Sequence, residues 1–141
     1  MEGIVMKIRS FLPVVMLAVV FVFAGCKSAE ETQAGTVDKT LSVQETKWYE
    51  TGSTVNDPVI YNPLEAGDLV YDDGYYRIEI ESVNEDVIVL DVDGCLVEPN
   101  SDGTINLRAE SVDEIEIAAG ESFELVSQTM DSGINLIISY E

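Results

Sequence analysis

The stretch that decides the fold class is YYRIEIESVNEDVIVL, residues 75–90. Its first half alternates apolar with charged residues, Tyr76, Ile78 and Ile80 against Arg77, Glu79 and Glu81. A period of two is typical of a β-strand with one face in water. Asn84-Glu85-Asp86 then predicts a turn, and Val87-Ile88-Val89-Leu90 is apolar on both faces, as in a central strand. The stretch therefore predicts two consecutive strands of one sheet.

Short strands between turn residues continue on both sides of this stretch. We expect further strands at residues 69–71, 95–97, 104–108, 114–118, 122–126 and 134–140. Residues 110–114 could also open a helix, but the alternation Ile115-Glu116-Ile117 favours a strand. Seven or eight short strands at this spacing predict an all-β fold, an antiparallel β-sandwich with an immunoglobulin-like arrangement as one candidate. A small barrel is the alternative.

The chain divides into three parts by composition. Residues 1–25 have the character of a signal peptide, and residues 26–47 are mostly polar, which predicts a flexible linker behind the signal. From Trp48 onward the period is that of strands, so we place the β-sandwich domain at residues 48–141. About 94 residues suffice for one independently folding core.

The amino-terminal part carries an export signal. Lys7 and Arg9 precede an apolar run at residues 11–24, which at 14 residues is shorter than the ~20 that span a bilayer. The sequence Phe23-Ala24-Gly25-Cys26 that follows resembles a lipobox, the recognition motif of bacterial lipoproteins. This resemblance implies cleavage between Gly25 and Cys26 by signal peptidase II and a diacylglyceryl group on the sulfur of Cys26. An ordinary secretory signal with a chance cysteine is the alternative.

Lipidation would decide where the protein resides. Several acyl chains hold a protein stably on a membrane, whereas a single chain binds only marginally. We therefore expect a lipid-anchored protein on the extracytoplasmic face of the cell membrane. Lys27 stands where the inner-membrane retention signal of Gram-negative lipoproteins has Asp, so in a Gram-negative host the resemblance implies the outer membrane.

The charge of the chain restricts its partners. The full sequence has 27 acidic and 7 basic residues, and cleavage removes Glu2, Lys7 and Arg9, which leaves 26 acidic and 5 basic residues and a net charge of −21. Such a charge disfavours nucleic acid and other polyanions. Divalent metals, basic peptides and basic protein surfaces remain open as partners. The simpler interpretation is that the charge keeps a surface domain soluble.

The sequence lacks the residues that several catalytic mechanisms require. The sequence contains no His, which excludes Ser-His-Asp and Cys-His nucleophile systems and His-dependent metal sites. With Cys26 acylated, Cys95 has no disulfide partner, and we expect it to be a buried small apolar residue rather than a nucleophile. A glycan hydrolase built from carboxylates alone is the remaining enzyme hypothesis. We expect no enzymatic activity.

Two sets of residues are candidate binding sites. Asp91, Asp93 and Asp102 lie at turns that could supply oxygen ligands to calcium. The turn-forming tendency of Asp-Gly alone also explains these residues, and we expect no other cofactor. Trp48, Tyr49 and Tyr61 are candidates for ligand binding at a tyrosine-rich end, whereas Tyr76 is expected in the core.

The leading hypothesis is a non-catalytic surface module. It would bind or assemble with another component of the cell envelope, a protein or a glycan, while the acylated Cys26 contacts membrane lipid. The first alternative is a glycan- or solute-binding module that uses the tyrosine-rich end. The second is the carboxylate-based glycan hydrolase.

Overall fold

The computed structural model describes residues 37–141, which form ten β-strands and no helix. Each strand is paired with at least one other strand through backbone hydrogen bonds, and the described chain is all-β, as predicted. The strands are β1 (Leu41–Tyr49), β2 (Gly52–Val55), β3 (Val59–Tyr61), β4 (Leu69–Asp72), β5 (Arg77–Val83), β6 (Val87–Asp93), β7 (Leu96–Val97), β8 (Glu114–Ala118), β9 (Glu121–Ser127) and β10 (Ser132–Tyr140).

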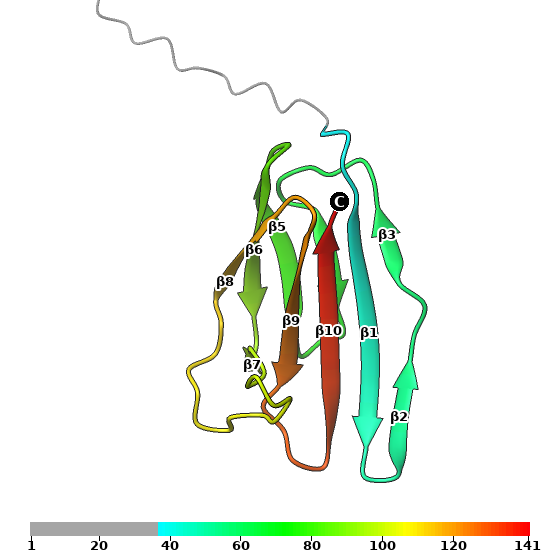
Figure 1. Cartoon of the computed structure of the whole chain (residues 1–141), viewed down its shortest axis with the longest axis vertical. Helices are drawn as coiled ribbons and strands as arrows, with labels where there is room; N and C mark the ends of the chain where they lie inside the picture. The colour runs from blue at the N-terminus through cyan, green and yellow to red at the C-terminus, as the bar shows by residue number, and fades with distance from the viewer. Residues whose placement is uncertain (1–36) are drawn as a thin grey trace, which may run out of the picture. The chain divides into compact units, whose positions relative to one another are not determined.

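The strands form two antiparallel sheets, which Figure 1 shows as two layers. The large sheet has the order β2-β1-β10-β9-β7, with β3 also paired to β1, and the small sheet has the order β4-β5-β6-β8. Immunoglobulin sandwiches have the strand orders ABED and CFG. The small sheet here instead begins with three consecutive strands, so the architecture is a sandwich with a different strand order.

The core lies between the two sheets. In β5 the side chains of Ile78 and Ile80 are buried and that of Arg77 is exposed, because successive residues of a strand point to opposite faces. Each such aliphatic side chain contributes about 1.5–3 kcal/mol when it is fully buried. The large sheet supplies Leu41, Val43, Leu96, Leu125, Ile134, Leu136, Ile138 and Tyr140, and the small sheet supplies Val70, Ile78, Ile80, Ile88, Leu90, Val92, Ile115 and Ile117.

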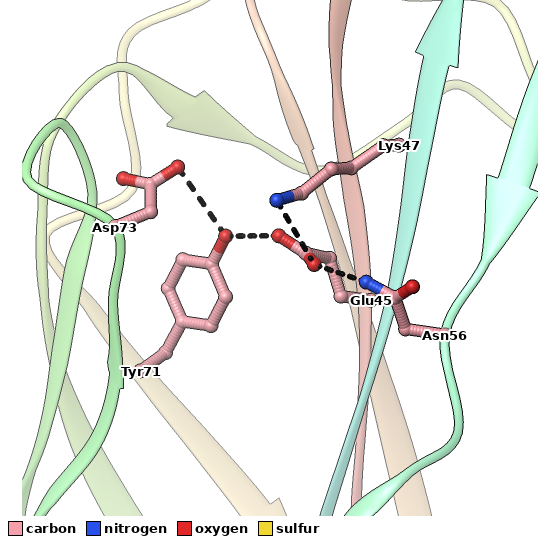
Figure 2. A network of polar contacts seen from close by, with 5 residues as sticks. All are labelled: Glu45, Lys47, Asn56, Tyr71 and Asp73. Atoms are coloured by element: carbon pink, nitrogen blue, oxygen red, sulfur yellow. Dashed lines mark hydrogen bonds and ion pairs between the residues drawn. The ribbon is translucent and has the colours of Figure 1, made fainter.

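Polar side chains link the two sheets between β1 and β4 (Figure 2). The hydroxyl of Tyr71, on β4, donates a 2.6 Å hydrogen bond to Oε1 of Glu45 on β1, and Oδ2 of Asp73 lies 3.4 Å from the same hydroxyl. Oε2 of Glu45 accepts a 2.6 Å hydrogen bond from Nδ2 of Asn56 and lies 3.5 Å from Nζ of Lys47. Burial, followed by the hydrogen bond to Glu45, raises the pKa of the Tyr71 phenol. We call these five residues the Glu45 network.

The sandwich begins earlier in the chain than the sequence predicts. The predicted linker covers residues 26–47 and the predicted domain begins at Trp48, but β1 starts at Leu41, and Val37 already forms a β-bridge with Leu64. Residues 37–47 therefore belong to the folded domain. Residues 1–36, with the predicted signal and the first part of the predicted linker, lie outside the described residues.

The first half of β1 follows the strand pattern and the second half does not. Leu41 and Val43 are buried on the core side of the strand, but the next two core-side positions are Glu45 and Lys47. Polar residues at core-side positions remove the alternation by which a strand is recognised. In the structure the Glu45 network provides partners for these two side chains.

Two further expectations are wrong. Residues 104–108 are not a strand but part of a loop of turns, because no neighbouring strand pairs with them and Asn106 bonds locally, its Oδ1 accepting from the N–H of Arg108. Cys95 is exposed rather than buried, since it follows Gly94 in the turn between β6 and β7 and only the next two residues enter the protein interior.

Most of the other predicted strands are confirmed. The alternation at residues 114–118 is β8 and not a helix, and the segment predicted as a central strand is β6, which lies between β5 and β8. Tyr76 packs against the core, as expected. Over residues 37–141, no helix has the length and apolar character needed to cross a membrane.

Candidate functional site

The outer face of the large sheet carries apolar residues that the core does not use. Val97 on β7 and Val126 on β9 are paired neighbours, and both are buried although neither belongs to the core between the sheets. They lie on the opposite side of the sheet from Leu96 and Leu125, because side chains alternate along a strand. A second layer therefore covers part of this outer face.

The loop at residues 98–110 provides part of this cover, and hydrogen bonds hold it in place. Nε2 of Gln128 donates to the carbonyl oxygens of Asn106 at 3.0 Å and Ala109 at 2.8 Å. Within the loop, Oδ1 of Asp102 accepts from the backbone N–H of Thr104 at 3.0 Å and from its hydroxyl at 2.6 Å. These bonds lower the pKa of the Asp102 carboxyl. The loop therefore has a defined conformation over the sheet.

A groove of about 520 Å³ lies between this loop and the strands of the large sheet. We call it the Trp48 groove. Its volume falls within the ~300–1,000 Å³ of typical ligand sites. Its apolar lining consists of Trp48, Pro99, Ile105, Leu107, Val126 and Met130. The rest of the lining consists of Gly103, Thr104, Glu124, Thr129 and Asn135.

Pairing between β1 and β10 positions Trp48. The partner of Trp48 in the ladder is Gly133, and a Cβ atom at Gly133 would lie 2.6 Å from Cζ2 of the indole. The same Cβ would lie 2.1 Å from Oγ of Ser127 and 2.5 Å from Oγ1 of Thr129. Only a residue without a side chain leaves the space in which the indole packs. Glycine at position 133 thus sets the position of one groove wall.

Asn135 and Glu124 form the polar floor of the groove. Nδ2 of Asn135 donates a 2.6 Å hydrogen bond to Oε1 of Glu124 on the neighbouring strand. Within residues 37–141, Oδ1 of Asn135 is buried and has no hydrogen-bond partner. A buried acceptor without a donor costs about 1–3 kcal/mol. The acceptor that the floor presents to a ligand is therefore the second carboxylate oxygen of Glu124, because Glu124 is exposed.

The walls present exposed apolar surface. Leu107 is 46% exposed and Met130 is 79% exposed, whereas Ile105 is half-buried. Apolar side chains of this size in the rim of a groove are typical of a binding surface. The sequence contains a trace of this wall, because the alternation of Ile105 and Leu107 that predicts a strand instead directs both side chains to the groove. Nothing in the sequence indicates that Glu124, Met130 and Asn135 join them.

The three aromatic candidates are not brought together. Trp48 lines the groove, but Tyr49 follows it on β1, points to the opposite face of the sheet and is 53% exposed. Tyr61 packs against the core, and its hydroxyl donates a 2.6 Å hydrogen bond to the carbonyl oxygen of Val70. Burial raises the pKa of Tyr61. Of the three aromatic candidates, Trp48 alone therefore lines the groove.

The three calcium candidates are also distributed. Asp91 and Asp93 share the exposed face of β6, where Asp93 lies opposite Arg77 and Asp91 lies opposite Glu114. Asp102 instead caps the turn at Thr104. Among residues 37–141, no group of three or more His, Cys, Asp or Glu side chains is arranged to hold a metal ion.

One carboxyl group on the acidic face of the small sheet, that of Glu114, has a raised pKa. The neighbouring carboxyl group of Glu81, through its side chain and its negative charge, raises the pKa of Glu114. Two carboxylates in contact cannot both ionise freely. The lipidation and cleavage residues predicted at Gly25 and Cys26 lie outside the described residues.

Comparisons of the chain with protein-family models, with curated proteins and with solved structures found no match. Function is therefore inferred from the residues of this chain.

Proposed function

We propose that this protein is a lipid-anchored extracytoplasmic binding module without catalytic activity, which recognises a component of the cell envelope through the Trp48 groove. The anchor rests on the lipobox-like sequence Phe23-Ala24-Gly25-Cys26 and on the basic and apolar segments before it. The observation that carries the binding function is the groove itself, a hollow with apolar walls and a polar floor on a sheet face that the core does not use.

The place of the groove supports the proposal. The described chain enters the sandwich at the Leu41 end of β1, and Thr40 and Glu141 exchange backbone hydrogen bonds of 2.8 and 2.9 Å there. Trp48 lies near the other end of the same strand, about 24 Å away at ~3.4 Å per residue. An anchor attached through the residues before Leu41 would hold one end of the domain and leave the groove end to a partner.

The lining of the groove supports a non-catalytic function. Glycoside hydrolysis by carboxylates uses two acidic residues that flank the reacting bond. Glu124 is the one carboxylate among the residues that line the Trp48 groove. It accepts a hydrogen bond from Asn135, which holds it as a fixed polar contact.

Site-specific crosslinking in native membranes tests the binding function. A photoreactive amino acid at Leu107, on the groove wall, should give a discrete crosslinked product with one envelope component. The same amino acid at Ile60, which is exposed on β3, is the matched control and should not give that product. Identical products from both positions, or none from Leu107, would refute binding through the groove.

Fatty-acid labelling tests the anchor. Cells supplied with an alkyne-tagged fatty acid should incorporate the tag into the wild-type protein, and the Cys26→Ser variant should remain unlabelled and keep its leader. The Cys95→Ser variant is the matched control, because it removes the other cysteine and should label normally. A labelled Cys26→Ser variant would contradict the proposed anchor.

A further inference from the structure

We infer that the occupant of the Trp48 groove is a cationic peptide segment that carries aliphatic side chains beside lysine or arginine. The inference rests on the proposed function, because it names the chemical class of partner for the same groove. Three independent observations lead to it: the charge at the groove, the direction of its free hydrogen bonds, and the chemistry of its walls.

The charge at the groove disfavours anionic ligands. Its lining includes the carboxylate of Glu124 and neither lysine nor arginine. Lys47 lies beside Glu45, and Arg77 lies 2.6 Å from Glu79. Arg108 follows Leu107 on the loop but is not among the residues that line the groove. The chain as a whole has a net charge of −20. A negatively charged ligand would meet repulsion, whereas a cation would be attracted from solution.

Most of the polar side-chain atoms in the groove that remain free to form hydrogen bonds are acceptors. The hydroxyl of Thr104 donates to Asp102, that of Thr129 to the carbonyl oxygen of Ser132, and the amide of Asn135 donates to Glu124. The indole N–H of Trp48 makes no hydrogen bond within residues 37–141, so this group and the second N–H of the Asn135 amide are the remaining side-chain donors.

Lysine and arginine side chains are donors only, so they match such a floor. A sugar hydroxyl is both donor and acceptor, and a glycan would find few donors for its oxygens. The free oxygen of Glu124, an exposed residue, is therefore better suited to an ammonium or guanidinium group.

The walls favour aliphatic rather than sugar contacts. Leu107, Met130 and Ile105 present branched carbon and thioether surface, which packs against apolar side chains of varied shape. Glycan sites stack sugar rings on flat aromatic faces, and Trp48 is the one aromatic residue in the lining. A leucine or similar side chain in the groove would bury Leu107 and Met130, while a neighbouring lysine reaches the floor.

Fluorescence of Trp48, the single tryptophan of the chain, reports on the groove directly. The full lipidated protein, held in zwitterionic phosphatidylcholine nanodiscs, is titrated with a capped Leu-Lys-Leu-Lys peptide. Leu-Glu-Leu-Glu and an uncharged trisaccharide of N-acetylglucosamine are the comparison probes. The lysine peptide should change the fluorescence with saturation, and raising the salt from about 50 to about 500 mM should weaken its binding. The other two probes should give flat titrations.

Matched variants separate the groove from general attraction to an acidic protein. Glu124→Gln should weaken binding of the lysine peptide roughly five- to tenfold, because a charge-assisted hydrogen bond is lost. Glu116→Gln removes the same charge from the exposed face of β8 and should change binding less than about twofold. Leu107→Ser should weaken binding, whereas Ile60→Ser should not.

The outcomes distinguish this inference from the proposed function. Equal effects of Glu124→Gln and Glu116→Gln would show unspecific charge attraction and overturn the inference. Binding of the trisaccharide without the lysine peptide would also overturn it, and would keep the groove as a binding site for glycans. A flat titration with the lysine peptide overturns the ligand class, while the crosslinking from Leu107 decides separately whether the groove binds at all.

Discussion

Removal of one hydroxyl group from the Glu45 network should destabilise the sandwich measurably. In the Tyr71→Phe variant, Oε1 of Glu45 loses a 2.6 Å hydrogen bond, and the side chain of Glu45 is only 15% exposed, so water replaces the bond poorly. Hydrogen bonds to charged groups contribute about 1.5–3 kcal/mol. We expect a loss near the lower end, about 1.5 kcal/mol, because Glu45 keeps Asn56 and Lys47 as partners. This loss corresponds to a fall in Tm of roughly 6–12 °C.

The stability of the protein at alkaline pH is a second measure of the contact between Tyr71 and Glu45. Folding raises the pKa of Tyr71, so above about pH 10 the unfolded chain releases the phenolic proton before the folded chain does. The contribution of the phenol to stability is therefore complete below about pH 10 and is lost as the pH rises further. Tyr61 and Tyr140 act in the same direction, because burial raises their pKa values as well. Tyr71→Phe should make the loss shallower by up to about 1.4 kcal/mol per pH unit.

Urea unfolding followed by circular dichroism, at pH 7 and between about pH 9 and 11, measures both effects. Tyr75→Phe is the matched control, since Tyr75 is 85% exposed and the same chemical change should cost less than about 0.5 kcal/mol. A double-mutant cycle with Glu45→Gln should give a coupling of about 1 kcal/mol. If Tyr71→Phe unfolds like Tyr75→Phe and declines equally in alkali, the reasoning about this network is refuted.

Four other predictions concern the groove and the loops. Gly133→Ala should cost about 1–3 kcal/mol by overpacking and shift the emission of Trp48, and an unchanged spectrum would contradict the packing described for the indole. Gln128→Ala should free the loop at residues 98–110, which limited proteolysis would detect as faster cleavage there than in the wild type. Asp102→Ala should lower the Tm slightly, equally with calcium or with a chelator, and a Tm that rises with calcium in the wild type alone would contradict this. Cys95 should react with a thiol reagent in the native protein as fast as in urea, and strong protection would contradict its exposure.

Local sequence patterns predict the strands in which every core-side position is apolar. β5, β6, β8 and β10 are of this kind, and each was expected within a few residues of its observed ends. Their periodicity is a property of the chain itself, because one face meets the core and the other meets water. The all-β class and the sandwich follow from these strands.

β1, β2 and β3, which the pattern does not predict, depend on contacts with distant residues. β2 is exposed along its whole length and carries no alternation, since it is an edge strand that needs only the backbone of β1 as a partner. β1 fails the pattern at Glu45 and Lys47. Other elements supply Tyr71 and Asn56, which are the partners of Glu45, and Glu45 in turn pairs with Lys47.

The groove has the same origin as these missed strands. Trp48 can be named as a ligand-binding candidate from its chemistry, but Asn135 becomes its neighbour only because β10 pairs with β1, and Val126 because β9 pairs with β10. The loop residues Ile105 and Leu107 complete the lining. No periodicity connects positions so distant in sequence, so a groove of this kind is visible only in the folded chain.

Leu41 lies opposite Tyr140 in the pairing of β1 with β10, so the domain assembles only when its first and last strands come together. The ladder that completes the middle of the large sheet joins the earliest and the latest strands, and contacts of such high sequence separation form slowly because a long loop must close first. A nascent chain therefore stays without its central ladder until β10 is available. Deleting β10 should then abolish cooperative unfolding altogether, instead of leaving a smaller stable remnant.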